Sequence, residues 1–316
     1  MFQPTNGFKK VALPCLACLG RSLLGPAFCL LSLLPMKTAQ AADKPFPVFD
    51  AGRIAVYALE DRPGNMDISL FSGSAAPEQR QKYFTDGKSP SSINVFLLES
   101  KGPERRLYLI DTGYGPFGPG QSGLDEQLRA LEATPDKIDG VLLTHMHMDH
   151  IGGLLKGDKR AFPRAAIFVS APEIGYWTAL ADRNPTDTNA GTVRKVLSAY
   201  GADVKAPFAF DEEVLPGVKA LDASGHTPGH TVFRIEAGGN RLLIIGDLLH
   251  AASLQFPLPD ECPRYDMDRQ AAVKTRKKIL NLAAEQNIPI AGMHVPFPGA
   301  GSVSKDWTGY KFIPVR

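Results

Sequence analysis

Short apolar runs separated by polar segments recur along most of the chain, and their lengths are typical of β-strands. We expect strands at residues 53–59, 93–98, 107–111, 140–143, 166–170, 218–221, 232–235, 242–245 and 288–292. Apolar residues at helical spacing predict helices at residues 124–132, 172–181, 192–200 and 269–286. The Gly238-Gly239-Asn240 turn predicts that two of the strands form a hairpin.

The last predicted helix shows its pattern most clearly. Its apolar residues recur at helical spacing and are expected to face the core: Ala272, Ile279, Leu280 and Ala283. Its basic residues are expected to form a solvated face: Lys274, Arg276, Lys277 and Lys278.

Two segments fall outside these elements. Residues 44–49 predict an extended arm that could serve a homodimer, and residues 72–92 predict a polar, partly helical excursion. The sequence has no internal linker, low-complexity run or short repeat. About 275 residues follow position 41, which suits one large domain, so we expect residues 42–316 to form it.

Residues 1–41 have the pattern of a secretory signal peptide. Basic residues precede an apolar stretch at 23–34, and Ala39-Gln40-Ala41 offers a small-residue cleavage site. We expect cleavage after Ala41 or Ala42 and a secreted or periplasmic mature protein. A transmembrane anchor is the alternative, but the apolar run is short of the ~20 residues that a span needs. We therefore expect no stable membrane insertion after processing.

Processing would also change the charge. Removing residues 1–41 removes four basic residues and no acidic residue, so Lys plus Arg falls from 35 to 31 against 33 Asp plus Glu. The formal net charge thus changes from +2 to −2, and no basic stripe remains that would favour nucleic acid.

Of the four cysteines only Cys262 follows position 41, so we expect no internal disulfide and a small buried side chain at Cys262.

Candidate metal ligands follow the apolar run at 140–143 directly. His145, His147, Asp149 and His150 fall within six residues, on the loop where a strand is expected to end. Imidazole nitrogen and carboxylate oxygen suit Zn²⁺ and similar divalent ions. His145 and His147 are two residues apart and can turn to one ion, while Asp149 and His150 can turn to a second.

The remaining four histidines lie at similar places in the predicted fold. His226 and His230, His250, and His294 each follow or end a β-like run. The candidate ligands therefore occupy the ends of successive strands, where loops carry chemistry on a rigid scaffold.

At these residues the chain resembles the metallo-β-lactamase superfamily. An HxHxDH signature at 145–150, a GHTPGH segment at 225–230, Gly246-Asp247 after a strand and the late His294 occur in the order of that family. The resemblance covers roughly residues 50–316. It implies an α/β fold, namely an αββα sandwich of two mixed β-sheets flanked by helices, with a mono- or dinuclear metal site at one edge of the sheets.

The resemblance also implies which residues hold two divalent ions. The first ion takes His145, His147 and His226, the second takes Asp149, His150 and His294, and Asp247 bridges both. Zinc is the default ion for such ligands, and related enzymes accept Mn, Co or Fe.

Longer segments narrow the resemblance further. Residues 247–256 and the tail at 294–299 and 309–315 look like those of the methyl parathion hydrolase subgroup, whose relatives include organophosphate hydrolases and lactonases. The resemblance implies a dinuclear hydrolase that directs a metal-bound hydroxide at neutral esters: organophosphotriesters, aryl esters or lactones. In N-acyl-homoserine lactonases the position of His250 carries a Tyr that assists the oxyanion.

The expected chemistry assigns a role to each remaining polar residue. Two bound ions lower the pKa of a water to about 7 and polarise the carbonyl or phosphoryl group. Asp149 is expected to carry a proton, and His250 to assist catalysis without binding metal. His230 is expected to orient Asp247 or a nearby loop by a hydrogen bond. Asp111 is expected to anchor the loop that bears the HxHxDH cluster.

Aromatic residues are candidates for the substrate pocket. Phe117 and Trp177 match substrate-pocket positions of the organophosphate hydrolase, and Tyr114, Phe256 and Phe297 fall near candidate site loops. Ordinary core packing is the alternative for each. An apolar pocket would favour a small-molecule ester, phosphotriester or lactone as the partner.

Other functions of the same fold stay open. A quorum-quenching N-acyl-homoserine lactonase is the alternative within the hydrolases. An iron-dependent sulfur dioxygenase is the alternative from another reaction class. A non-catalytic binding module is disfavoured because such descendants usually lose ligands, and none is missing here.

Overall fold

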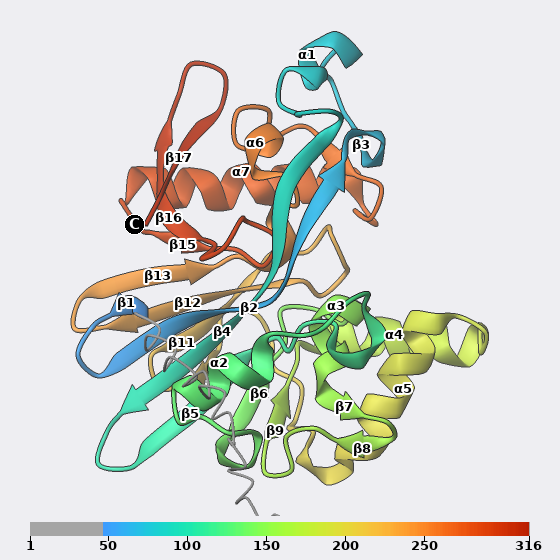
Figure 1. Ribbon diagram of the computed structural model, residues 1–316, viewed down its shortest axis with the longest axis vertical. Helices are drawn as coiled ribbons and strands as arrows, with labels where there is room; N and C mark the ends of the chain where they lie inside the picture. Colours follow the sequence, from blue (N-terminus) through green and yellow to red (C-terminus); the bar gives the residue numbers. More distant parts are fainter. Residues whose placement is uncertain (1–46, 316) are drawn as a thin grey trace, which may run out of the picture. The chain divides into compact units, whose positions relative to one another are not determined.

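The first of two large sheets carries the HxHxDH loop. In the computed structural model, which describes residues 47–315, its strand order is β1-β2-β4-β5-β6-β9 (Figure 1). The strands are β1 (Pro47–Asp50), β2 (Ile54–Asp67), β4 (Lys88–Lys101), β5 (Arg105–Ile110), β6 (Gly140–Leu142) and β9 (Ala166–Phe168). Strands β5, β6 and β9 are parallel, and the other pairs are antiparallel, so the sheet is mixed. The predicted signal peptide at 1–41 lies outside the described residues.

The second sheet carries the later histidines. Its order is β10-β11-β12-β13-β15-β16-β17. The strands are β10 (Glu213–Leu215), β11 (Val218–Asp222), β12 (Thr231–Ala237), β13 (Asn240–Ile244), β15 (Ile290–Ala291), β16 (Ala300–Lys305) and β17 (Tyr310–Pro314). Only the β13–β15 pair is parallel. Two small sheets pair β3 (Phe71–Ser72) with β14 (Cys262–Pro263), and β7 (Leu155–Lys156) with β8 (Lys159–Arg160).

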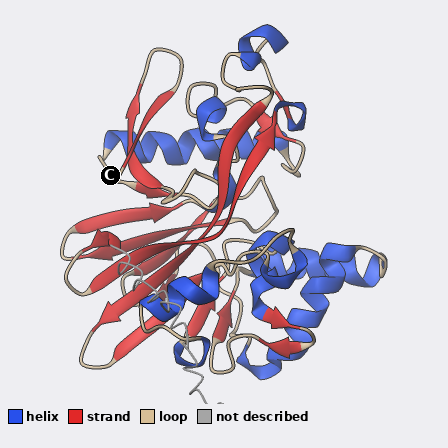
Figure 2. Ribbon diagram, viewed as in Figure 1, coloured by secondary structure: helices blue, strands red, loops and turns tan. Residues whose placement is uncertain are grey.

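Helices cover the outer faces of the two sheets (Figure 2). The α-helices are α1 (Pro77–Gln81), α2 (Leu124–Ala130), α3 (Met148–Ile151), α4 (Ala171–Arg183), α5 (Thr188–Tyr200), α6 (Ala252–Gln255) and α7 (Arg269–Glu285). The short 3-10 helices are η1 (Ile68–Leu70), η2 (Gly115–Phe117), η3 (Pro135–Lys137), η4 (Gly152–Leu154), η5 (Gly201–Asp203) and η6 (Gly246–Leu248).

Three apolar cores define the layers. One lies between the first sheet and helices α2, α4 and α5, one between the two sheets, and one between the second sheet and α7. The layer order is therefore helix, sheet, sheet, helix, and the expected αββα sandwich of two mixed sheets is confirmed.

Burial of both sheet faces explains why the predicted strands are continuous apolar runs. In β2, Ala55 and Leu59 join the core beneath the helices, while Val56 and Ala58 between them join the core between the sheets. Side chains alternate between the two faces of a strand, so a strand covered on both faces needs apolar residues at every position.

The Gly238-Gly239 turn closes the predicted hairpin between β12 and β13. Ala237 pairs with Asn240 across it, and both glycines have positive φ, 58° and 82°. Two-residue hairpin turns with positive φ at both central positions favour glycine, since it has no Cβ to clash.

Parts of the fold differ from the prediction. Strands β2 and β4 are 14 residues each, so they continue well beyond the predicted runs as a long hairpin. Residues 88–92 of the predicted excursion belong to β4, whereas α1 lies inside it as expected. The hairpin of β16 and β17 was not predicted, because its residues alternate weakly and half of them are exposed.

Helix α7 corrects the expected solvated basic face. Lys274 and Lys278 are exposed as predicted, and the four apolar residues of the pattern are buried. Arg276, however, is only 1% exposed. Arg276 lies four residues after Ala272 and four before Leu280, so helical spacing places it on the apolar face, where it points inward to buried hydrogen-bond acceptors.

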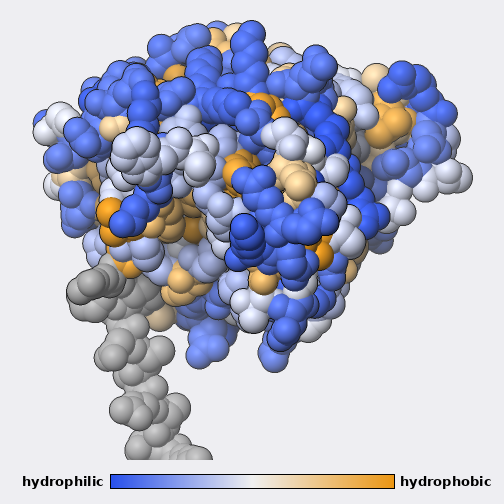
Figure 3. Space-filling view, turned by 90° about the horizontal axis from the view of Figure 1, so that it is seen from above, coloured by the Kyte–Doolittle hydropathy of each residue, from blue (hydrophilic) through white to orange (hydrophobic). Residues whose placement is uncertain are grey.

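Two further expectations concern surfaces and cysteine. Among the described residues, no helix is long and apolar enough to cross a membrane. The face shown in Figure 3 is mostly hydrophilic, with small, separate hydrophobic patches. Cys262 is buried and unpaired.

The predicted arm at 44–49 lies partly outside the described residues. Residues 47–49 belong to β1, which pairs with β2. The homodimer that the arm could serve stays a prediction.

Candidate metal centre

Four loops from the ends of strands meet at one place. His145–His150 follow β6, His226–His230 join β11 to β12, Asp247–His250 follow β13, and His294 follows β15. Because strand ends of two packed sheets lie along one edge, residues far apart in sequence converge there.

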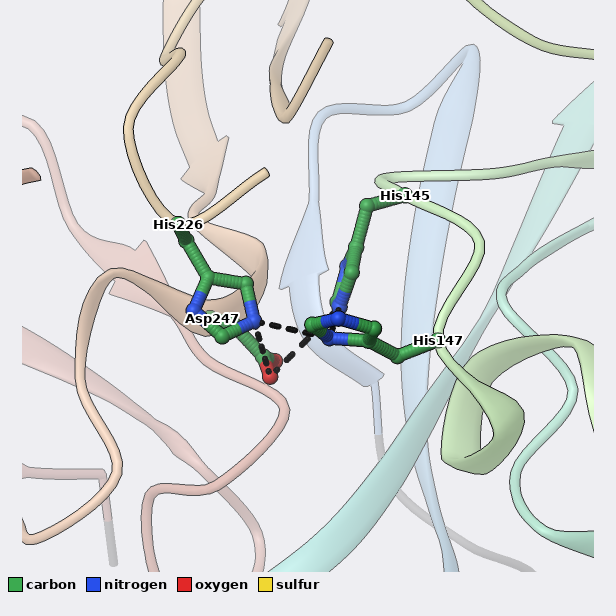
Figure 4. A group of neighbouring side chains, drawn as sticks. All are labelled: His145, His147, His226 and Asp247. Atoms are coloured by element: carbon green, nitrogen blue, oxygen red, sulfur yellow. Dashed lines mark hydrogen bonds and ion pairs between the residues drawn. The ribbon is translucent and has the colours of Figure 1, made fainter. Parts of the chain in front are cut away.

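The first group of converging side chains contains His145, His147, His226 and Asp247. Each offers one ligand atom, and these atoms all lie within 4.8 Å of one another. His147 Nδ1 lies 2.9 Å from His145 Nε2 and 3.0 Å from His226 Nε2. Figure 4 shows the four side chains pointing at a common centre. Ring nitrogens that crowd together in this way are arranged as a cation needs them.

The second group contains Asp149, His150, Asp247 and His294. His150 Nε2 lies 3.2 Å from Asp247 Oδ1, and His294 Nε2 lies 3.1 Å from Asp247 Oδ2. His294 Nε2 is also 3.3 Å from Asp149 Oδ2. Asp247 therefore belongs to both groups, and the structure brings together all seven residues that the sequence indicated as ligands.

Unsatisfied buried atoms test whether the groups fit cations. Among the described residues, His150 Nε2 and Asp247 Oδ1 are buried without a hydrogen-bond partner. Such an atom costs roughly 1–3 kcal/mol when it stays unsatisfied. Nitrogen and carboxylate ligands at this spacing suit two divalent ions such as zinc. The residues present thus fit two ions, and both orphaned atoms would gain a partner from the second.

The pKa values of the rings agree with this fit. Burial holds the pKa of His145 well below its ordinary value and lowers that of His147 to about 3, so both rings keep free lone pairs. In the second group burial also acts to lower the pKa, but the negative charge of Asp247 outweighs it. The pKa of His294 is thereby raised to about 10, which shows a local field that attracts positive charge.

Oxygen partners hold four of the rings from behind. In each of them Nδ1 donates to an oxygen. His145 donates to Thr144 Oγ1 (3.1 Å) and His150 to Asp111 Oδ2 (2.7 Å). His226 donates to Asp266 Oδ1 (2.9 Å) and His294 to the Ser92 carbonyl (3.0 Å). Such bonds fix the tautomer and leave Nε2 free for a cation.

Asp111 anchors the HxHxDH loop as expected. Its Oδ1 accepts from the Thr144 N–H at 2.8 Å, and its Oδ2 accepts from Thr144 Oγ1 at 2.7 Å. The same carboxylate orients His150. Asp266, which does the same for His226, was missed, because nothing in its sequence surroundings marks it.

Glu173 was also missed, although it joins two ligand loops. Its Oε1 accepts from the Met146 N–H at 2.8 Å, and its Oε2 accepts from Thr227 Oγ1 at 2.7 Å and the Gly229 N–H at 2.9 Å. Ser170 and Glu173 fit the sequence pattern of a helix capping box, which explains a glutamate here without any site. The structure instead turns the Glu173 carboxylate toward the loops.

His230 forms the orienting hydrogen bond that was expected. Its Nε2 accepts from the Asp247 N–H at 2.9 Å. Gly246 has a φ of 54°, and a Cβ there would lie 2.4 Å from His230 Nε2. Glycine before Asp247 therefore allows both the turn and the approach of His230.

His250 lies beside the ligands without joining either group of four. Its Nε2 is 3.1 Å from Asp247 Oδ2, and its ring stacks on that of His294 at 4.9 Å between centroids. Burial lowers its pKa to about 4, so the ring is neutral near neutral pH.

A cavity of about 610 Å³ opens onto both groups. Besides the ligands, it is lined by Arg62, Pro63, Asn65, Met66, Leu70, Ile93, Tyr114, Met148, Asn189, His250 and Tyr265, among others. Much of this wall comes from the long β2–β4 hairpin, which the sequence did not predict at its full length.

The aromatic residues expected in the pocket are largely elsewhere. Among the described residues that line the cavity, neither Phe117 nor Trp177 appears, whereas Tyr114 does. Phe117 is 41% exposed in η2, and Trp177 is 3% exposed. The Trp177 indole packs edge-on to His147 at 5.5 Å and donates to Glu173 at 2.7 Å, so it supports a ligand from behind. Phe256 stacks on Phe312 in the core.

Solved structures with this fold include hydrolases. One is AidC, a dizinc quorum-quenching lactonase in complex with a product, with 27% identity and a TM-score of 0.76 over 85% of this chain and 96% of that chain. Another is hydrolase AbOPH of the beta-lactamase superfamily, with 32% identity and a TM-score of 0.74 over the same shares, 85% and 96%.

Curated relatives match a smaller share of the chain. A probable metallo-hydrolase of Mycobacterium bovis is 26% identical over 50% of this chain, and the match spans 56%, little more than half, of that relative. An N-acyl homoserine lactonase of Bacillus cereus is 22% identical over 60% of this chain and 72% of its own length. The family model of the metallo-beta-lactamase superfamily matches residues 89–289. This chain therefore belongs to the metallo-beta-lactamase superfamily, as the motif order at 145–294 indicated.

Proposed function

We propose that the protein is a two-metal hydrolase of neutral esters, with lactones as the leading substrate class. The observation that carries this proposal is the pair of ligand groups that share Asp247 and open into one cavity. All seven ligand positions are filled, so the site keeps what a dinuclear hydrolase needs.

The catalytic roles follow from position and exposure. Two bound divalent ions, zinc by default and Mn, Co or Fe as alternatives, would lower the pKa of a water to about 7 and polarise the ester. Asp149 lines the cavity and its side chain is partly exposed, so its carboxylate can take up a proton from the attacking water. Asp247 holds both groups together, and His250 faces the cavity beside it.

The cavity wall favours an uncharged substrate. Arg62 is the only Lys or Arg among the described residues that line it. Its guanidinium is engaged by Asp61 at 2.9 Å and by the Gly115 and Pro119 carbonyls at 2.8 and 2.6 Å. Among the described residues, this wall therefore offers an anionic substrate no unpaired Lys or Arg, whereas Met66, Leu70 and Ile93 offer apolar surface.

Lactones are placed first because AidC and several relatives are named as lactonases. Organophosphotriester and aryl ester hydrolysis, the activity of the methyl parathion hydrolase type, is the second candidate. His250 supports it, because the family resemblance puts a Tyr at this position in N-acyl-homoserine lactonases, whereas here an imidazole faces the cavity.

A hydrolysis screen tests the proposal. Protein loaded with two equivalents of zinc should hydrolyse N-acyl homoserine lactones, simple lactones, nitrophenyl esters or paraoxon-type triesters, and EDTA should abolish the activity. The lactone arm and the triester arm separate the two candidates. A metal-replete protein that hydrolyses none of these four substrate classes would contradict the proposal.

The same preparation tests two further points. Bound iron with oxygen uptake on a persulfide substrate would replace hydrolysis by the sulfur dioxygenase alternative. We also propose that the protein acts after export, because residues 1–41 have the pattern of a signal peptide.

A further inference from the structure

Arg276, a buried residue of α7, donates hydrogen bonds to four acceptors. Its Nε donates to the Leu248 carbonyl at 2.6 Å, its Nη1 to the Pro259 and Glu261 carbonyls at 2.9 and 3.2 Å, and its Nη2 to Asp266 Oδ2 at 3.0 Å. The planar guanidinium, with five donors in a fixed fork, suits acceptors that lie in several directions.

Two of these acceptors adjoin the metal centre. Asp266 accepts from His226 through its other oxygen, at 2.9 Å. Leu248 directly follows Asp247, the residue shared by both ligand groups. Arg276 therefore reaches the first group through the carboxylate that orients His226.

The position of Asp266 between Arg276 and His226 suits this role. One carboxylate oxygen accepts from Arg276 Nη2 at 3.0 Å, and the other accepts from His226 Nδ1 at 2.9 Å. The second bond orients the ring so that His226 Nε2 faces His147 Nδ1 at 3.0 Å.

Stability alone does not explain the buried pair. Replacing both partners of a buried ion pair by neutral residues is often neutral or stabilising, so a buried pair is weak evidence for a role in stability. A guanidinium that is 1% exposed and bonded to a ligand's carboxylate partner therefore points to a task beyond packing.

We propose that Arg276 is a positioning residue which, through Asp266, sets the cation affinity of the group formed by His145, His147, His226 and Asp247. The inference rests on the proposed two-metal function. The second group shares only Asp247 with the first. Its other two rings have their own partners, Asp111 for His150 and the Ser92 carbonyl for His294, so it should be affected much less.

Zinc titration against a chromophoric chelator tests this directly. The full chain is compared as wild type, Arg276→Met, Asp266→Asn and the double variant, with Lys278→Met as the control because Lys278 is exposed on the same helix. Each single variant should bind one zinc roughly 10–100-fold more weakly and keep the other near wild-type affinity. The double variant should lose no more zinc affinity than the single variant that binds zinc more weakly, since Arg276 acts through Asp266.

Cobalt spectra and melting curves complete the test. The visible spectrum of the first-site cobalt should shift in the Asp266 and Arg276 variants, and Lys278→Met should match wild type. If Arg276→Met does not fold, Asp266→Asn and the double variant carry the comparison.

Three results would overturn the inference: wild-type affinity for both zinc ions in the variants, equal weakening of both ions, or additive losses in the double variant. These results leave the proposed function standing. A wild-type protein that binds fewer than two ions would instead overturn that function.

Discussion

Glu173 and Met146 are joined by a hydrogen bond of 2.8 Å, from the Met146 N–H to a carboxylate oxygen. Met146 lies between the ligands His145 and His147, and the other oxygen of Glu173 accepts from the Gly229 N–H. A single buried side chain of α4 thus fixes the distance between the loops of the first ligand group.

Glu173→Gln should loosen both loops. The amide of Gln presents donors to groups that are themselves donors, and leaving buried groups unpaired costs roughly 1–3 kcal/mol. We expect a melting temperature lower by a few degrees and metal affinity or activity lower by roughly 10–100-fold, measured by calorimetry and zinc titration. Glu126→Gln, at an exposed position of α2, is the matched control. Unchanged zinc affinity in Glu173→Gln would contradict the loop-joining role.

His250→Ala should separate catalysis from metal binding. His250 faces the cavity and contacts Asp247, but it belongs to neither ligand group. We expect turnover to fall roughly 10–100-fold, as for other partners of ligands, with metal content near that of wild type by elemental analysis. Loss of a full equivalent of metal would make His250 a ligand instead.

Zinc uptake by the metal-free protein should release protons. Burial acts against protonation, but Asp247 and Asp149 raise the pKa of His294 from 6.5 to about 10, and the pKa of His150 is raised as well. The His294 ring is therefore protonated near neutral pH, and a cation must displace that proton. Calorimetric titration in buffers of different ionisation enthalpy measures the release.

The same shift sets the pH dependence of the metal-free protein. A pKa raised by folding contributes stability that is complete below the unfolded value of 6.5 and is lost as pH rises toward about 10. Unfolding midpoints should therefore fall over this window without metal and stay flatter with zinc. Identical pH profiles of the unfolding midpoint with and without zinc would show that the raised pKa of His294 does not cause the pH dependence.

The cavity wall predicts which apolar residues select the substrate. Ile93 lines the cavity, whereas Phe117 does not. Ile93→Ala should raise KM for esters with apolar substituents roughly tenfold, because each lost CH₂ contact contributes about 0.8 kcal/mol. Phe117→Ala should leave KM unchanged. A raised KM in Phe117→Ala and an unchanged KM in Ile93→Ala would contradict this prediction and favour Phe117 as a pocket residue, as the family resemblance implied.

The layered fold was largely predictable because each strand buries both faces. Runs such as Leu242–Ile244 contribute to two cores at once, and this requirement leaves a continuous apolar signal. The β16–β17 hairpin carries no such signal, because only part of it is covered.

The ligands were predictable for a different reason. Histidines spaced within a few residues at strand ends have few structural explanations, so His145 and His147 stood out. Asp266 and Glu173 act on those ligands from distant positions and look like ordinary loop and helix residues. Their roles depend on which loops the fold brings together, and periodicity says nothing about that.

Metal content of wild type and Asp247→Ala is the most direct measurement of the central claim. Asp247 belongs to both ligand groups, so its loss should affect both ions. We predict two ions per chain in wild type and near-complete loss in Asp247→Ala, with circular dichroism showing that the variant is folded. One ion or none in wild type after zinc loading, or two retained in Asp247→Ala, would contradict the shared two-metal centre.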